Sequence, residues 1–154
     1  MFEDKPNWLQ ALKEQLGEGK VSFDKERLRE FSHDQTEDIS NLPEVVVRPV
    51  TTEDVSIVLR IANKFGIPVT PAAARTGLSG GAIPIFGGIS LSMEGLSKII
   101  EIDESNSQAT VEPGVINQVF HEACKDKGLF YPPDPSSWGS STSVSYTHLR
   151  AHET

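Results

Sequence analysis

Cysteine and long apolar runs are nearly missing from this chain of 154 residues. Its single cysteine, Cys124, excludes a disulfide within the chain and favours a reducing compartment. No stretch approaches the roughly 20 consecutive apolar residues that a membrane-spanning helix needs. Residues 1–6 are charged and lack the apolar centre of a signal peptide. We therefore expect a cytoplasmic location, no transmembrane segment, and a Cys124 that is buried on a helix rather than catalytic.

Positive charge is scarce as well. The chain has 14 Lys and Arg against 22 Asp and Glu, a formal net charge of −8. This balance disfavours a nucleic acid as partner. An anionic ligand would have to be held by local backbone N–H donors rather than by a broad positive field. With 37% hydrophobic residues, the chain is long enough to form a domain with its own core.

Residues 1–41 are predicted to be an N-terminal helical segment. Its first helix has four apolar residues on one face: Trp8, Leu9, Leu12 and Leu16. A second helix is predicted from Asp24 to Phe31, and residues 32–38 form a polar connection. The segment therefore leads into the main domain, which we place at residues 42–143.

A strand–helix–strand pattern opens that domain. Residues 44–48 are predicted to be a strand, and Thr51 to Asp54 resemble a capping box at the start of a helix. The helix has apolar residues at helical spacing, namely Val55, Val58, Leu59, Ala62 and Phe65. Gly66 ends the helix, and residues 67–70 form the second strand. A loop at the carboxyl end of that strand is where open α/β sheets bind ligands.

The rest of the domain is richer in strands. Strands are predicted at 88–93, 99–102 and 108–112, followed by a helix at 114–128 and a short strand at 129–131. The apolar residues expected to face inward from the helix are Val115, Val119, Phe120 and Ala123. The predicted fold class is α+β, with a βαβ lobe followed by a strand-rich lobe.

The loop between these parts has the strongest functional signal. Thr76-Gly-Leu-Ser-Gly-Gly81 puts three glycines and two hydroxyls into six residues. Such a loop can direct several backbone N–H groups at one anion, and a diphosphate suits this arrangement. An ordinary glycine-rich turn is the alternative. A P-loop hydrolase is a weaker one, because no Lys-Ser/Thr pair follows Gly80-Gly81.

Five ordered segments support the functional interpretation: 43–49, 67–71, 76–81, 109–114 and 132–137. Together they resemble the FAD-binding, PCMH-type domain of vanillyl-alcohol-oxidase-like flavoproteins, in particular the glycolate oxidase D-subunit and D-lactate dehydrogenase family. The resemblance implies a two-lobed, truncated α+β domain of a flavin-dependent 2-hydroxyacid dehydrogenase or oxidase. It implies FAD as cofactor, a 2-hydroxyacid as substrate and an electron acceptor that is not identified. An FAD domain of another oxidoreductase in the superfamily is an alternative.

The resemblance also implies which residues contact FAD. In the first loop these are Ala72, Ala73, Ala74, Arg75, Thr76, Gly77, Leu78, Ser79, Gly80 and Gly81. Pro113 and Gly114 would shape the adenine side, and Pro133, Asp134, Ser136 and Ser137 would lie near the flavin and its ribityl chain. Residues 72–76 would surround the diphosphate with backbone amides, and Ser79 would donate its hydroxyl. No catalytic residue and no metal ligand is assigned.

Two positions depart from the family pattern. The family has Arg-Gly-x-Gly before the threonine, where this chain has Ala72-Ala-Ala-Arg75. A side chain in a left-handed conformation costs roughly 1 kcal/mol relative to glycine, so a different loop path is expected. Arg75 would then either pair with phosphate or extend into solvent. Thr76 replaces the histidine of the flavin-tethering branches, so non-covalent FAD is expected.

The C-terminal residues differ most from the family. A second glycine-rich segment of the type Gly-Gly-Asn is expected after Ser137, but Trp138 to Thr154 read differently. The last residues look like a translated sequencing adapter, so 144–154 are predicted to be a non-native tail. The chain would then be an N-terminal part that oxidises no hydroxyacid and binds FAD weakly or not at all. His148 and His152 have helical spacing, but no third ligand accompanies them.

Overall fold

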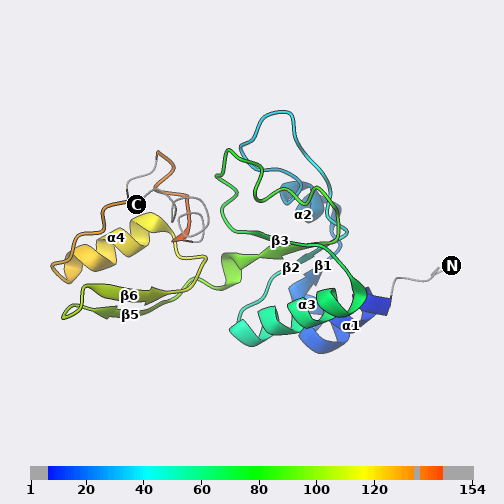
Figure 1. Ribbon diagram of the computed structural model, residues 1–154, viewed down its shortest axis with the longest axis horizontal. Helices are drawn as coiled ribbons and strands as arrows, with labels where there is room; N and C mark the ends of the chain where they lie inside the picture. Colours follow the sequence, from blue (N-terminus) through cyan, green and yellow to red (C-terminus); the bar gives the residue numbers. More distant parts are fainter. Residues whose placement is uncertain (1–6, 134–135, 144–154) are drawn as a thin grey trace. The chain divides into compact units, whose positions relative to one another are not determined.

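The computed structural model describes residues 7–133 and 136–143, which form two compact units (Figure 1). The N-terminal unit contains the chain up to Ala72 together with Gly77–Ser92. The C-terminal unit contains Ala73–Thr76 and the chain from Met93 onward. A mostly parallel sheet with helices in the first unit and a hairpin with a helix in the second confirm the predicted α+β class. The predicted tail at 144–154 lies outside the described residues.

A sheet of four strands organises the N-terminal unit. The strands are β1 (Val21–Ser22), β2 (Val45–Val47), β3 (Val69–Ala72) and β4 (Ile89–Ser92), in the order β1-β2-β4-β3. The central strand β4 is parallel to both β2 and β3, whereas β1 is antiparallel to β2. All four residues of β4 are buried, as expected for a parallel strand that is covered on both faces.

Helices cover both faces of this sheet (Figure 1). The helices α1 (Asn7–Leu16) and α3 (Thr52–Phe65) pack against each other, and the short helix η1 (Glu18–Lys20) leads from α1 into β1. On the opposite side lies α2 (Lys25–Glu30), next to a core cluster of Phe31, Val46 and Ala72. All four apolar residues predicted for the first helix are buried, which confirms that prediction.

The boundaries of α3 follow from its own sequence. Thr51 and Asp54 form a reciprocal capping box, and Gly66 ends the helix in the left-handed conformation at φ 65°. The buried face agrees with the predicted one at Val58 and Ala62 and differs from it in part, because Ile61 is buried whereas Leu59 is 49% exposed. Asp54, Val58, Ile61 and Ala62 are spaced by i, i+4, i+7 and i+8, and the sheet selects this stripe.

Asp54 is the buried carboxylate that ties α3 to the chain before it. It accepts two hydrogen bonds from Lys20 Nζ at 2.7 and 2.8 Å, and further ones from the N–H groups of Val50 and Thr51. Burial alone would raise the pKa of Asp54, but these donors and the charge of Lys20 outweigh it and lower the pKa.

Replacing this carboxylate by an amide, Asp54→Asn, is expected to lower the free energy of unfolding by about 2 kcal/mol, since charged hydrogen bonds are lost. The contribution of the lowered pKa is complete above the unfolded-state pKa of about 3.9 and disappears as pH falls through the folded-state pKa. Urea unfolding at pH 7 and at pH 3 measures both effects, and the difference between wild type and variant should shrink at the lower pH. Glu53→Gln is the control, because its pair with Arg60 is exposed and should contribute less than about 0.5 kcal/mol. Equal effects of the two substitutions would contradict this account.

The C-terminal unit is a hairpin with one helix. Its strands β5 (Ile99–Asp103) and β6 (Gln108–Val111) are antiparallel, and the helix α4 (Asn117–Asp126) follows them. A short helix, η2 (Met93–Gly95), precedes β5. The core consists of Val115, Phe120 and Cys124, against which side chains of both strands pack. Burial of Cys124 is therefore confirmed, and burial raises the pKa of its thiol.

Three predictions for this unit are wrong. The helix begins at Asn117 rather than near Gly114, because Gly114 and Val115 form a turn closed by bonds to Leu96 and Glu112. Val119 is 51% exposed rather than buried. Residues 129–131 form no strand with any described residue, and Tyr131 instead packs its ring edge-on against Phe120. Among the described helices, none has the length and apolarity to cross a bilayer.

Candidate functional site

The glycine-rich loop begins at the carboxyl edge of the parallel sheet. Strands β3 and β4 are parallel neighbours, so the chain must cross back over the sheet between them. It does so without a helix, and Gly77–Ser92 belong to the N-terminal unit. The carboxyl edge is where open α/β sheets bind ligands, so the topology makes this loop a candidate binding position.

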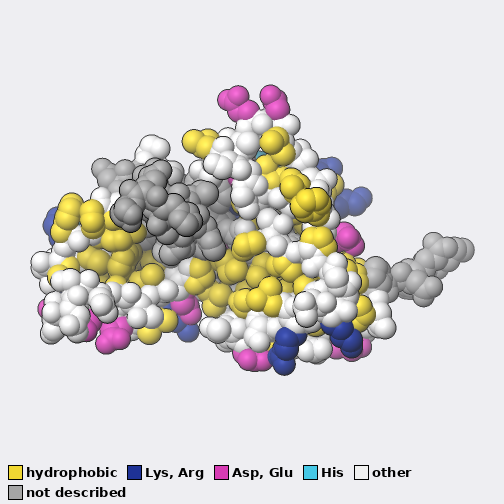
Figure 2. Space-filling model, in the orientation of Figure 1, with side chains coloured by type: hydrophobic (Ala, Val, Ile, Leu, Met, Phe, Trp, Pro, Cys, Tyr) yellow, Lys and Arg dark blue, Asp and Glu magenta, His cyan; other side chains and the backbone are white. Residues whose placement is uncertain are grey.

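Several backbone donors of the loop are available. In the described part of the chain, the N–H groups of Leu78, Ser79 and Gly81 form no hydrogen bond, and all three residues are exposed. The Gly80 N–H donates to Thr36 Oγ1 at 2.7 Å. Figure 2 shows basic side chains in small separate groups on the face in view. The unbonded backbone N–H groups of this loop are therefore the donors that could bind an anion.

Among the three loop glycines, the backbone requires glycine at one. Gly80 has φ +71°, where a side chain is strained, although a Cβ there would meet only Ile83 Cδ1 at 3.8 Å. A Cβ at Gly81 would meet nothing within 4 Å, and one at Gly77 would lie 3.7 Å from Asp34 Oδ2. Gly80 therefore determines the path of the loop.

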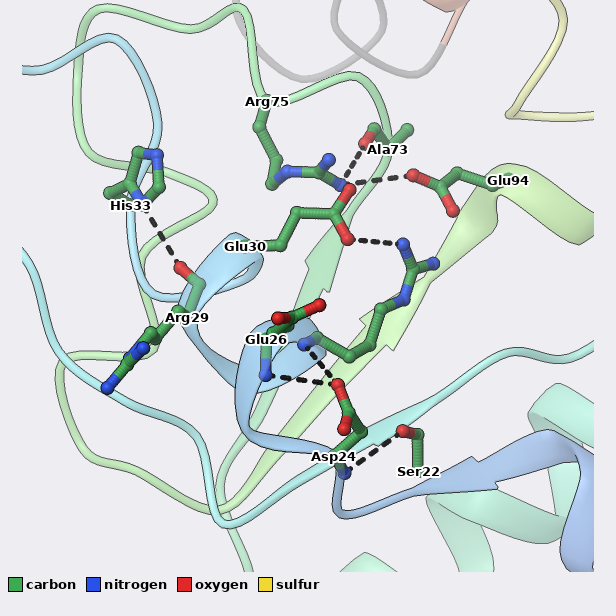
Figure 3. A network of polar contacts seen from close by, with 10 residues as sticks. Ser22, Asp24, Glu26, Arg29, Glu30, His33, Ala73, Arg75 and Glu94 are labelled. Carbon is green, nitrogen blue, oxygen red and sulfur yellow. Dashed lines mark hydrogen bonds and ion pairs between the residues drawn. The ribbon is translucent and has the colours of Figure 1, made fainter.

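The first part of the predicted loop, residues 73–76, belongs to the C-terminal unit. Arg75 has a left-handed backbone at φ 53°, whereas Ala73 is not in that region. The Arg75 Nη1 atom donates to Ala73 O at 2.9 Å and to Glu94 Oε1 at 3.1 Å (Figure 3). The arginine side chain is only 15% exposed, so the alternative in which it extends into solvent is wrong. These bonds stabilise the left-handed residue where the family has glycine.

A groove of about 410 Å³ lies in the C-terminal unit. It is lined by Ala74, Glu94, Ser97, Gly114, Val115, Ile116, Val119, Ser140 and Thr142. Two predicted residues, Ala74 and Gly114, are thus brought together. The Thr142 hydroxyl is buried and has no hydrogen-bond partner in the described residues. A groove with apolar side chains, the Glu94 carboxylate and several hydroxyls, one of them orphaned, is suited to a ring system that carries polar groups.

The segment after Tyr131 contributes differently from the prediction. Pro133, Ser136 and Ser137 do not line this groove, and Asp134 lies outside the described residues. Ser137 O accepts hydrogen bonds from the N–H groups of Ser140 and Ser141 and thus closes a turn. This turn is tied to α4 through the buried Asn117, which donates to Ser141 Oγ at 2.8 Å.

Sequence reasoning missed the polar residues on the groove and beside the loop. Glu94, Ser140 and Thr142 line the groove, and only the density of hydroxyls around Ser140 could have indicated them. Residues 32–38, predicted as a connection, bond to the glycine-rich loop. In the described residues no group of three or more potential metal ligands occurs, and His148 and His152 lie outside them.

Comparisons with known proteins agree on one family. The family model described as FAD binding domain matches residues 43–152. The chain is 42% identical to glycolate oxidase subunit GlcD of Bacillus subtilis over 112 residues, covering 73% of this chain and 24% of that protein. It is 36% identical to a D-lactate dehydrogenase of Anaerostipes hadrus over 131 residues, covering 84% and 27%.

A solved structure is similar as well. The 4-ethylphenol oxidase from Gulosibacter chungangensis superposes with a TM-score of 0.79 at 29% identity, over 92% of this chain and 28% of that one. The chain thus spans about a quarter of the length of the curated relatives it matches.

Proposed function

The chain belongs to the FAD-binding domain family, and we propose that it holds FAD in a flavin-dependent dehydrogenase or oxidase of 2-hydroxyacids. The observation that carries this proposal is the loop at the carboxyl edge of the sheet, with the unbonded N–H groups of Leu78, Ser79 and Gly81. Relatives named for glycolate and D-lactate support a small 2-hydroxyacid as substrate.

Within this proposal each part of the chain has a role. The free N–H groups of the loop bind the diphosphate, and the Ser79 hydroxyl adds a donor. In the C-terminal unit, Gly114 and the groove walls would hold a ring of the cofactor, and the Thr142 hydroxyl would be free to bond to a polar atom of that ring. FAD, when held by these residues, would supply the hydride-accepting chemistry, and this chain would contribute binding and orientation. By family resemblance, Pro113, Pro133, Asp134, Ser136 and Ser137 complete the contacts.

The attachment and location are part of the same proposal. Thr76 stands where the flavin-tethering relatives have histidine, which supports non-covalent binding. Flavin should accordingly stay in solution when the loaded protein is precipitated with acid. The single buried cysteine, Cys124, fits a reducing cytoplasmic compartment.

Calorimetric titration of the full 154-residue chain with FAD tests the proposal. We expect weak but saturable binding, and weaker binding of FMN, which has one phosphate and no adenosine. Saturation by FMN with the same affinity would argue against diphosphate recognition, and no saturation by FAD at millimolar concentration would overturn the proposed function.

The variant Gly80→Ala is expected to weaken FAD binding about tenfold. A left-handed alanine costs about 1–2 kcal/mol, which shifts the loop away from the binding conformation. The matched control is Gly81→Ala, because Gly81 has an ordinary φ and open space around its Cβ position. The same titration measures both variants. Equal affinities of the two would show that the conformation at Gly80 does not matter for the cofactor.

A further inference from the structure

We infer that Asp34-Gln35-Thr36 is the positioning element of the glycine-rich loop and selects which loop N–H groups face the diphosphate. The inference rests on the proposed function. It concerns residues 32–41, which lie along the loop within the N-terminal unit and follow α2 (Figure 1). Thr36 does not touch the cofactor in this account. It acts through Gly80.

Two hydrogen bonds fasten the loop to this element, one near each end of its glycine-rich part. The Gln35 N–H donates to Gly77 O at 3.0 Å, and the Gly80 N–H donates to Thr36 Oγ1 at 2.7 Å. Farther along, Asn41 Nδ2 donates to Pro84 O at 2.7 Å. The loop, which has no regular secondary structure, is thereby held by a segment about 40 residues earlier in the chain.

Asp34 stabilises the conformation of the positioning element itself. Its carboxylate is 6% exposed and accepts the Thr36 N–H at 2.8 Å, which fixes the turn that presents the Thr36 hydroxyl. The other carboxylate oxygen accepts the Ala82 N–H at 3.5 Å and lies beside Gly77. A buried anion beside the loop repels a phosphate from that side.

The division of donors follows from these contacts. Gly80 gives its N–H to Thr36, whereas Leu78, Ser79 and Gly81 are exposed and keep theirs unbonded. Without the Thr36 acceptor, the Gly80 N–H has no partner. The left-handed conformation of Gly80 then loses the hydrogen bond that stabilises it. The loop then samples other conformations, and its free N–H groups are no longer held in one arrangement.

The test removes one hydroxyl. Thr36→Val keeps the shape of the side chain and is expected to weaken FAD binding about tenfold, the loss of one hydrogen bond. Hydrogen exchange of the Gly80 amide, measured by NMR without ligand, should become about tenfold faster for the same reason. Thr36→Ser restores the acceptor and should restore both values. Thr52→Val is the matched control, because Thr52 is exposed and belongs to helix α3 rather than to the loop.

The outcomes separate the two claims. If wild type binds FAD and Thr36→Val binds it equally well, the positioning role is overturned and the proposed function stands. If Thr36→Ser fails to restore affinity, the hydroxyl is not the cause and the inference is overturned. If wild type fails to bind FAD, the proposed function and this inference both fall. Should Thr36→Val not fold, Thr36→Ala removes the same hydroxyl without the added methyl group and is compared with Thr36→Ser.

Discussion

The variant Gly114→Ala is expected to unfold the C-terminal unit or to lower its free energy of unfolding by at least about 3 kcal/mol. A Cβ at this position would lie 2.3 Å from Met93 O and 2.7 Å from Leu96 O. Both atoms are backbone atoms, which no side-chain rotation can move. The Gly114 N–H donates to Leu96 O at 2.7 Å. The same oxygen would collide with an added Cβ, so Gly114 cannot move away without losing this hydrogen bond.

Urea unfolding followed by tryptophan fluorescence measures this effect. The chain has two tryptophans, with Trp8 in the N-terminal unit and Trp138 in the C-terminal unit. Trp8→Phe in the background leaves Trp138 as the reporter. The matched control is Gly139→Ala, whose Cβ would meet only the mobile end of Gln118 at 3.3 Å and should change stability by less than about 0.5 kcal/mol. An unchanged midpoint for Gly114→Ala would mean that the surrounding backbone can yield.

A second large effect is expected for Gly88→Ala, which should destabilise the N-terminal unit by about 3 kcal/mol or more. The added Cβ would lie 2.4 Å from Pro68 O and 3.1 Å from Pro68 Cδ, at a residue with φ +69°. Gly88 immediately precedes the central strand β4, and its carbonyl accepts N–H groups from Glu44 and Val45. Any shift of this residue therefore disturbs the pairing of β2 with β4.

The neighbouring glycine separates the two causes of this effect. Gly87 also has φ +69°, but a Cβ there would lie 3.8 Å from Glu44 Oε1, an ordinary contact. Gly87→Ala is expected to cost about 1 kcal/mol through backbone strain alone. Unfolding monitored by Trp8 with Trp138→Phe in the background compares the variants. Equal losses would show that strain, rather than collision with Pro68, explains the requirement for glycine at residue 88.

Elements bounded by local signals agree between sequence and structure. Helix α3 begins at its capping box and ends at Gly66, because each signal involves residues within one helical turn. The hairpin of β5 and β6 forms around Asp103, whose carboxylate accepts the N–H groups of Ser105 and Asn106. The partners in these interactions lie within a few residues of one another, so a short stretch of sequence is sufficient to predict them.

Burial on a helix is harder to read from the sequence. Leu59 and Val119 are apolar and have helical spacing, yet they are exposed, while Ile61, which is not on the predicted face of its helix, is buried. A helix with more apolar residues than one stripe can hold has several possible inner faces. Packing against the sheet or the hairpin selects one of them, and that choice depends on residues far away in the sequence.

For the candidate site, the order of its motifs along the chain was enough to identify the FAD-binding domain family, and it indicates the loop at residues 76–81 as the candidate site. Those motifs are contiguous, and a glycine-rich loop uses backbone geometry that neighbouring residues encode. The ion pair of Arg75 with Glu94, the orphaned hydroxyl of Thr142 and the bond from Gly80 to Thr36 became visible with the fold. Each depends on residues that folding brings together: 44 positions separate Gly80 from Thr36, and the spacing of residue types along the chain does not encode such a meeting.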